Sequence, residues 1–191
     1  EGETACGEDC CVAGETCQDN VCLGEVVGTC TLPSSYGMVS VTGDADLQSN
    51  MIITYANLPA ADGTIDQISI QLYAGSGAMA GGFAEGTYTI EGDDLNFRTC
   101  GLCVQLFGNI DEETGASAAR YFITGGTVVI TELDGSLAAT LTNATFEEVT
   151  VAGDYTSTPV PDGCLTSMET VNYVATVPVV EGACEPLAPT C

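Results

Sequence analysis

Residues 125–151, GGTVVITELDGSLAATLTNATFEEVTV, decide the fold class of this chain. Polar and apolar side chains alternate on both sides of Asp134 and Gly135. An Asp-Gly pair between two alternating runs predicts a β-hairpin, because glycine accepts the positive φ of a type I′ turn. A two-residue loop would form these pairs across the hairpin: Leu133 with Ser136, Ile130 with Ala139, and Val128 with Leu141.

The same alternation predicts which face of the hairpin is buried. One face carries only apolar side chains, namely Val128, Ile130, Leu137, Ala139 and Leu141. The spacing slips after Leu141, since the next apolar residues in the run are Ala144 and Phe146. We therefore expect a β-bulge near Thr142 and Asn143, which would return the second half of the strand to the buried face.

Short alternating runs separated by Gly, Pro, Asp and Asn recur along most of the chain. No run has the 3.6-residue period of a helix, and residues 74–84 contain too much glycine for one. We expect strands at residues 38–42, 51–56, 65–73, 86–90, 103–108, 119–124, 127–133, 136–151 and 168–177. About nine such strands predict an all-β domain, an antiparallel β-sandwich or jelly roll.

The chain divides by composition into three parts. Residues 1–30 are rich in cysteine and poor in apolar residues, which indicates a small disulfide-rich module. Residues 31–177 form the predicted β-sandwich domain. Residues 178–191 form a tail that contains proline and cysteine. Both ends of the chain carry cysteines, and we expect both ends to be disulfide-bonded to the domain or packed against it.

Charge is the most unusual feature of the composition. The chain has 191 residues with 27 acidic and two basic ones, which gives a net charge of −25. The basic residues are Arg98 and Arg120, and there is no histidine or lysine. This charge excludes binding to nucleic acid and disfavours anionic membranes, whereas it favours divalent cations. A general role in solubility is the alternative. Both arginines are candidates for internal carboxylate pairs.

Eleven cysteines in this chain indicate an oxidising compartment. We expect a secreted protein, extracellular or at the cell surface. A removed signal sequence is the simplest account of a chain that begins with Glu1, and no apolar run is long enough to span a bilayer. Ten cysteines are predicted to form disulfides: Cys6, Cys10, Cys11, Cys17, Cys22, Cys30, Cys100, Cys103, Cys164 and Cys184. Cys191 is the candidate for an intermolecular bond, and a bond back to the domain is the alternative.

Two cysteine motifs have a second interpretation. The pattern C-x3-CC-x5-C-x4-C at residues 6–22 resembles the small knottin- and EGF-like modules of secreted proteins. A zinc cluster is the alternative, which the absence of histidine disfavours.

Cys100 and Cys103 form a C-x-x-C motif, which in a thioredoxin-like protein would be a redox site. Here it precedes an apolar strand rather than a helix. We therefore expect structural disulfides, either local or to Cys164.

Four runs of the β-domain resemble sequences of other β-sandwich proteins. They are FAEGTYTIEG at 83–92, CGLCVQLFG at 100–108, ARYFITGGTVVITELDGSLAATLTNATFEEV at 119–149 and DGCLTSMETVNYV at 162–174. Together they resemble β-sandwich domains of uncharacterised secreted or surface proteins in myxobacteria and related bacteria. The resemblance covers about half of the chain and rests on patterns of turns and strands. It implies a fold and an extracellular location, and it implies no catalytic residues.

The residue types present exclude most catalytic chemistry. Without histidine or lysine the chain has no Ser-His-Asp or Cys-His site, no Schiff base and no phosphate-binding P-loop. A pair of acids could hydrolyse glycosides, with candidates on strands and in loops: Glu132, Glu147, Glu148, Asp111, Glu112, Glu113 and Asp154. A sugar cleft usually needs aromatic platforms, and this chain has no tryptophan and 6% aromatic residues. We expect no enzymatic activity.

Calcium is the one cofactor that the sequence suggests, because calcium sites need clustered oxygen ligands. Residues 43–50 begin like a calcium loop, with acids two positions apart, but they lack the glycine and the final glutamate of an EF-hand. The candidate ligands lie in three acidic clusters: Asp44 and Asp46, Asp93 and Asp94, and Asp111 and Glu112. The alternative for each cluster is a solvated turn.

Two functional hypotheses follow, and the sequence favours the first, with the second as its alternative. The first is a structural subunit of an extracellular fibre, sheath or surface assembly, which self-associates through disulfides and strand pairing. Edge strands pair readily unless lysine or proline blocks them, and the predicted strand at 168–177 could add to the sheet of a neighbouring molecule. The second is a monomeric secreted binding or adhesion module, with or without calcium, that recognises a glycan or a surface protein.

Overall fold

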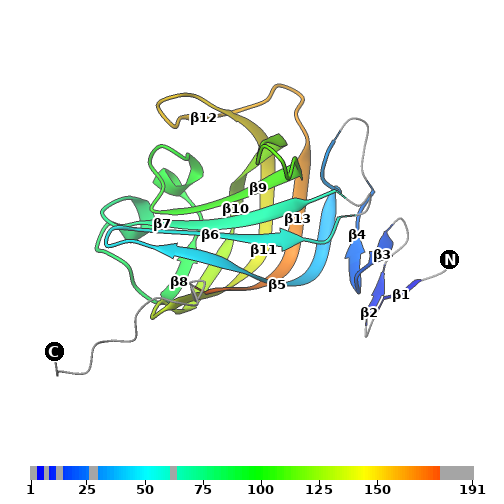
Figure 1. Ribbon diagram of the computed structural model, residues 1–191, viewed down its shortest axis with the longest axis horizontal. Coiled ribbons are helices and arrows are strands. Elements are labelled where there is room, and N and C mark those ends of the chain that lie inside the picture. The colour runs from blue at the N-terminus through cyan, green and yellow to red at the C-terminus, as the bar shows by residue number, and fades with distance from the viewer. Residues whose placement is uncertain (1–3, 7–8, 12–14, 26–29, 61–63, 177–191) are drawn as a thin grey trace.

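The computed structural model describes residues 4–6, 9–11, 15–25, 30–60 and 64–176, and these are almost entirely β-structure (Figure 1). The all-β prediction is confirmed. The strands are β1 (Thr4–Cys6), β2 (Asp9–Cys11), β3 (Thr16–Gln18), β4 (Val21–Leu23), β5 (Ser35–Leu47), β6 (Met51–Leu58), β7 (Asp66–Tyr73), β8 (Gly86–Thr89), β9 (Leu102–Ile110), β10 (Ser117–Glu132), β11 (Ser136–Val151), β12 (Ser157–Pro159) and β13 (Leu165–Thr176). Two short 3₁₀ turns, η1 (Gly77–Met79) and η2 (Gly92–Leu95), interrupt them.

Seven strands close into a barrel in the order β5-β6-β7-β9-β10-β11-β13. Neighbours are antiparallel except β13 and β5, which pair in parallel from Ser167 opposite Ser35 to Thr176 opposite Asp44. This closure corrects the prediction of a sandwich or jelly roll. Alternating side chains show only that one face of each strand is buried, and the inner face of a barrel and the inner face of a sandwich both meet that requirement.

The β10–β11 hairpin forms largely as predicted. Val128 pairs with Leu141, and Ile130 pairs with Ala139. The loop is longer than expected, because β10 ends at Glu132 and three residues precede β11, so the predicted pair of Leu133 with Ser136 is absent from the ladder. Within this loop only Gly135 has a positive φ, of 73°. A single left-handed residue is typical of a three-residue hairpin loop rather than of a type I′ turn.

The predicted β-bulge in β11 is confirmed. The ladder passes from Thr127 opposite Thr142 to Gly125 opposite Thr145, so β11 contributes one residue more than β10 over this step. Asn143 lies within the bulge and has a φ of 50°. Asparagine tolerates this left-handed conformation better than most residues do. The bulge keeps both halves of the strand facing the core.

Apolar side chains fill the barrel. The five residues predicted for the buried face of the hairpin are each at most 4% exposed, and Ala144 and Phe146 are each 1% exposed. Side chains of alternate residues on the other strands complete the core, among them Ile68, Ile70, Leu72, Leu102, Val104 and Leu106. Since these residues point inward, the residues between them point to the outer face of the barrel.

Four disulfides hold the described residues together, so the prediction of disulfide bonding is confirmed. Cys6–Cys17 and Cys11–Cys22 link the four short N-terminal strands. Cys30–Cys164 joins the segment before β5 to the segment before β13, and Cys100–Cys103 is local. The side chain of Cys10 and all of the tail with Cys184 and Cys191 lie outside the described residues.

Strand β13 has partners on both of its sides. It pairs with β11 along eleven positions from Ser136 to Glu147 and with β5 on its other edge. The expectation that this strand is free to join the sheet of a neighbouring molecule is therefore wrong. In the described part of the chain, no helix has the length and apolar character needed to cross a bilayer.

Candidate functional site

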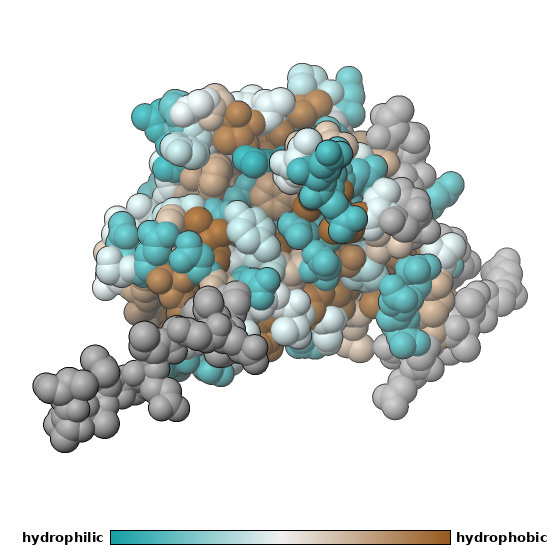
Figure 2. Space-filling view, in the orientation of Figure 1, coloured by the Kyte–Doolittle hydropathy of each residue, from teal (hydrophilic) through white to brown (hydrophobic). Residues whose placement is uncertain are grey.

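A groove lies on the outer face of the barrel, over strands β6, β7, β9 and β10. It consists of a larger hollow of about 870 Å³ and a second hollow of about 610 Å³. The two hollows share Tyr55, Phe107 and Arg120. We call the two hollows together the aromatic groove. Figure 2 shows that hydrophobic side chains are interspersed with hydrophilic ones on the face turned toward the viewer, so apolar residues are not confined to the core.

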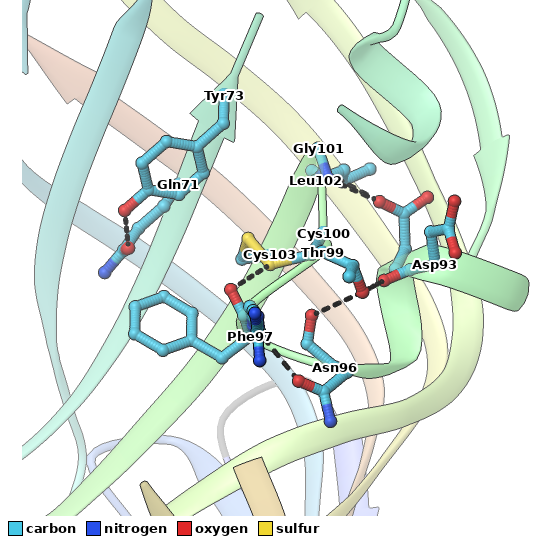
Figure 3. Close-up of a disulfide and its surroundings, with 12 residues drawn as sticks. Gln71, Tyr73, Asp93, Asn96, Phe97, Thr99, Cys100, Gly101, Leu102 and Cys103 are labelled. Atoms are coloured by element: carbon cyan, nitrogen blue, oxygen red, sulfur yellow. Dashed lines mark hydrogen bonds between the residues drawn. A yellow bond between two sulfur atoms is a disulfide. The ribbon is translucent and has the colours of Figure 1, made fainter. Parts of the chain in front are cut away.

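Strand β7 contributes a row of hydrogen-bonded polar side chains to this face. The Tyr73 hydroxyl donates to Gln71 Oε1 at 2.7 Å, and Gln71 Nε2 donates to Ser69 Oγ at 3.1 Å. Figure 3 shows the first of these bonds beside the ring of Phe97. Burial raises the pKa of the Tyr73 phenol above its ordinary value, and nearby tyrosines raise it further. The phenol therefore remains a neutral donor at physiological pH.

Gln105 on β9 lies directly opposite Ser69 and has an unsatisfied polar atom. Its side chain lines the larger hollow, yet the residue is only 1% exposed. Its Oε1 accepts no hydrogen bond from any described residue. A buried acceptor without a donor costs about 1–3 kcal/mol, so such atoms are rare in native proteins. An O–H or N–H group that enters the groove would satisfy it.

Aromatic rings line the groove, although aromatic residues make up only 6% of the chain. Tyr55 lies 6.2 Å from Phe107 between ring centres, and Phe97 meets Tyr155 edge-on at 5.9 Å. Tyr73 is the fifth ring. These rings supply flat apolar surface next to the amides of β7 and β9.

Tyr155 is held in an unusual conformation at the rim. The residue is 65% exposed. Its φ of 67° lies in the left-handed region, which large side chains rarely adopt. The neighbouring Asp154 maintains this turn, because its Oδ1 accepts the Thr156 N–H at 3.1 Å. Strained backbone of this kind persists where the surrounding structure requires it, and it is frequent at binding sites.

Both arginines of the chain line the groove. Arg98 Nη1 contacts Asp154 Oδ2 at 2.8 Å, which confirms the predicted carboxylate pair, although both side chains are more than half exposed. Arg120 forms no ion pair with any described residue. Its guanidinium instead lies 5.0 Å from the centre of the Phe107 ring, so the prediction of an internal carboxylate pair is wrong for Arg120.

Asp94 holds one wall of the groove in place. It is 4% exposed, and its Oδ1 accepts the N–H of Gly101 at 2.7 Å and of Leu102 at 3.0 Å. Its Oδ2 accepts the N–H of Ala78 at 2.9 Å. These bonds fix the turn that contains the Cys100–Cys103 disulfide (Figure 3). The carboxylate is therefore used by the backbone, in contrast to its predicted role as a calcium ligand.

Residues 96–99, which precede this turn, are held to β12 and to η2 by a second set of hydrogen bonds. Asn96 Nδ2 donates to the Ser157 carbonyl at 2.9 Å, and the Phe97 N–H donates to Ser157 Oγ at 3.1 Å. Thr99 Oγ1 donates to the Asp93 carbonyl at 2.7 Å. These bonds fix the backbone that carries the Phe97 ring into the groove.

The other predicted calcium ligands remain dispersed. Asp44 and Asp46 are exposed on β5, and Asp93 is exposed on η2. Asp111 and Glu112 border the second hollow, where backbone N–H groups of the same turn lower the pKa of Asp111. Among described residues, no three carboxylates have oxygens within 4.8 Å of one another; the only such group of metal-binding side chains is Cys6, Cys11 and Cys22, which are disulfide-bonded.

Among the residues that line this groove, the sequence singled out Arg98, Arg120, Cys100, Asp111 and Glu112 as candidates. Its aromatic and amide residues carry no motif, and they are brought together from three strands and two loops. Comparisons with protein-family models, with curated proteins and with solved structures found no match for this chain. The resemblance to secreted or surface proteins of myxobacteria therefore stays a prediction.

Proposed function

We propose that this protein is a secreted, non-enzymatic binding module that recognises a glycan in the aromatic groove. One observation carries the proposal: the buried Oε1 of Gln105, which has no hydrogen-bond partner among the described residues, belongs to a side chain that lines a hollow bordered by aromatic rings. A binding pocket typically combines apolar surface with a few oriented polar groups, and this groove has both.

A glycan fits the chemistry of these side chains. Sugar rings present C–H groups on their faces, which pack on aromatic rings, and hydroxyls at their edges, which need donors and acceptors. Exposed rings such as Tyr55 and Tyr155 supply the first kind of contact, and they lose little entropy on binding because they are rigid. The amide of Gln105 supplies the second kind, since a side-chain amide both donates and accepts.

Binding without catalysis is supported by the residues of the larger hollow. Glycoside hydrolysis uses two carboxyl groups that flank the scissile bond. No described aspartate or glutamate lines the larger hollow. The four disulfides support an oxidising, extracellular location.

The fibre-subunit hypothesis offered residues 168–177 as one strand that could join a neighbouring sheet, and this strand is occupied within the barrel. Both edges of β13 are paired within the barrel. A net charge of −25 opposes close packing of copies at low salt. We therefore favour the binding module over self-association.

A glycan array tests the proposal. The wild-type protein is expected to bind at least one glycan family, and Tyr155→Ala is expected to weaken that binding roughly tenfold, because an exposed aromatic platform is lost. Leu165→Ala is the matched control, since Leu165 is 68% exposed and lies outside the groove. A folded protein that binds no glycan, or that binds equally well after Tyr155→Ala, would refute the proposal.

A further inference from the structure

The two positive charges of an acidic chain lie in the same groove. Arg98 and Arg120 are separated in sequence and reach this face from a loop and from β10. Arg98 is already paired with Asp154 at 2.8 Å. Arg120 is the cation of the described residues without a carboxylate partner. Its charge is therefore available to a ligand.

The position of Arg120 suits recognition of a carboxylate. It is the cross-strand partner of Phe107, and its guanidinium carbon lies over that ring, 5.0 Å from the ring centre. A cation–π contact does not use up the N–H donors of the guanidinium, and no described carboxylate pairs with them. That edge can bind both oxygens of a carboxylate.

We infer that the ligand is a glycan that contains a uronic acid residue and that Arg120 binds the isolated carboxylate of this residue. This inference rests on the proposed glycan-binding function. A uronate places its carboxylate on the same ring as its hydroxyls. The carboxylate pairs with Arg120, and a hydroxyl donates to Gln105 Oε1, since both residues line the larger hollow.

The charge of the whole protein limits how many acidic groups the ligand carries. A net charge of −25 repels a polyanionic chain. Salt at physiological ionic strength screens a single exposed charge beyond about 8 Å. Nearby Asp111 and Glu112 border the second hollow and add to the repulsion of a polyanion. A mostly neutral glycan with occasional uronates therefore fits better than a polyuronate.

Three matched pairs of trisaccharides test the inference by isothermal titration calorimetry. Each pair consists of a neutral glucose, galactose or mannose chain and the same chain with its central hexose oxidised to the uronate. The wild-type protein is expected to bind one uronate about tenfold or more tightly than its neutral partner, because a charge-assisted pair forms. Arg120→Met is expected to remove this preference, so that the uronate and its neutral partner bind with equal affinity.

A ligand-side control remains valid if the variant does not fold. The methyl ester of the preferred uronate is expected to bind the wild-type protein no better than the neutral chain does. Three results would overturn the inference. The acid and neutral chains could bind equally well, the preference for the acid could survive esterification or Arg120→Met, or all three uronates could fail to bind. If the neutral chains bind and Tyr155→Ala weakens them, the glycan-binding function still stands, whereas a negative glycan array removes both proposals.

Discussion

The guanidinium of Arg120 lies 5.0 Å from the centre of the Phe107 ring, and the two residues are direct partners across the β9–β10 ladder. A chain with two cations and 27 acids has many carboxylates with which to pair an arginine. Here one arginine lies over an aromatic ring, and both residues line each of the two hollows. This arrangement makes the outer face of β6, β7, β9 and β10 chemically different from the rest of the acidic molecule.

Gln105→Leu separates ligand binding from stability. The change removes a buried oxygen that has no donor in the described part of the chain. The free energy of unfolding is therefore expected to stay the same or to rise by about 1 kcal/mol, while glycan affinity falls. Gln71→Leu is the matched control, because its amide bonds both Tyr73 and Ser69. Its loss is expected to cost about 1–3 kcal/mol. Urea denaturation measures both. Equal destabilisation by the two changes would show that Gln105 is a structural residue.

Asp94→Asn is expected to destabilise the protein by about 2–3 kcal/mol, because an amide retains only one of the two carboxylate oxygens. The buried carboxylate accepts N–H groups from Ala78, Gly101 and Leu102. Asp93→Asn is the control, since the neighbouring side chain is exposed and is expected to tolerate the change. Thermal unfolding of both variants provides the measurement. A similar melting temperature for the two would contradict the structural role of Asp94.

The long-range disulfide is expected to stabilise the protein more than the local one. Cys30–Cys164 closes a loop with a sequence separation of 134, whereas Cys100–Cys103 has a separation of 3. Chain-entropy arguments give about 5 kcal/mol for the first and about 2 kcal/mol for the second. Differential scanning calorimetry of the two double-alanine variants tests this order. If the loss of Cys100–Cys103 lowers stability more, the entropy argument is contradicted. The local disulfide would then stabilise the folded protein by holding the wall of the groove in place.

Acid is expected to loosen the rim of the groove. Hydrogen bonds from Thr156, followed by the charge of Arg98, hold the pKa of Asp154 below its ordinary value in the folded protein. A lowered folded pKa means that this stabilisation is present above the ordinary pKa of an aspartate, about 3.9, and is lost as the pH falls through the folded value.

An NMR titration of the Tyr155 amide measures this acid transition. The amide signal is expected to shift as Asp154 is protonated, and Asp154→Asn is expected to abolish the shift. A signal that still moves in the variant would assign the transition to a different acid, and the pH dependence of the rim would then have another origin.

Part of the fold could be predicted because it depends on neighbours in the chain. The hairpin pairs at Val128 and Ile130 and the bulge near Asn143 follow from side-chain alternation and from its interruption. The closure between β13 and β5 could not be predicted in this way. It joins strands from the two ends of the domain, and nothing in either strand specifies a parallel partner.

The groove likewise contains residues that the sequence could identify and residues that it could not. Arg98 and Arg120 could be singled out from composition, because they are the only cations. Gln105 could not be distinguished from Gln67 or Gln71, since all three are glutamines at alternate positions of apolar strands. Their difference lies in their partners: Gln71 has Tyr73 and Ser69, Gln67 has Asn57, and the Oε1 of Gln105 has none among the described residues.

The order of residues was therefore sufficient to establish the β class, the central hairpin and the acidic, disulfide-bonded character of the chain. These properties depend on the period of each strand and on residue counts, which are local or additive. The barrel and the groove required the folded arrangement. A side chain on a sheet obtains its neighbours from adjacent strands. The pairing of Phe107 with Arg120 or of Ser69 with Gln105 exists only after distant strands have aligned.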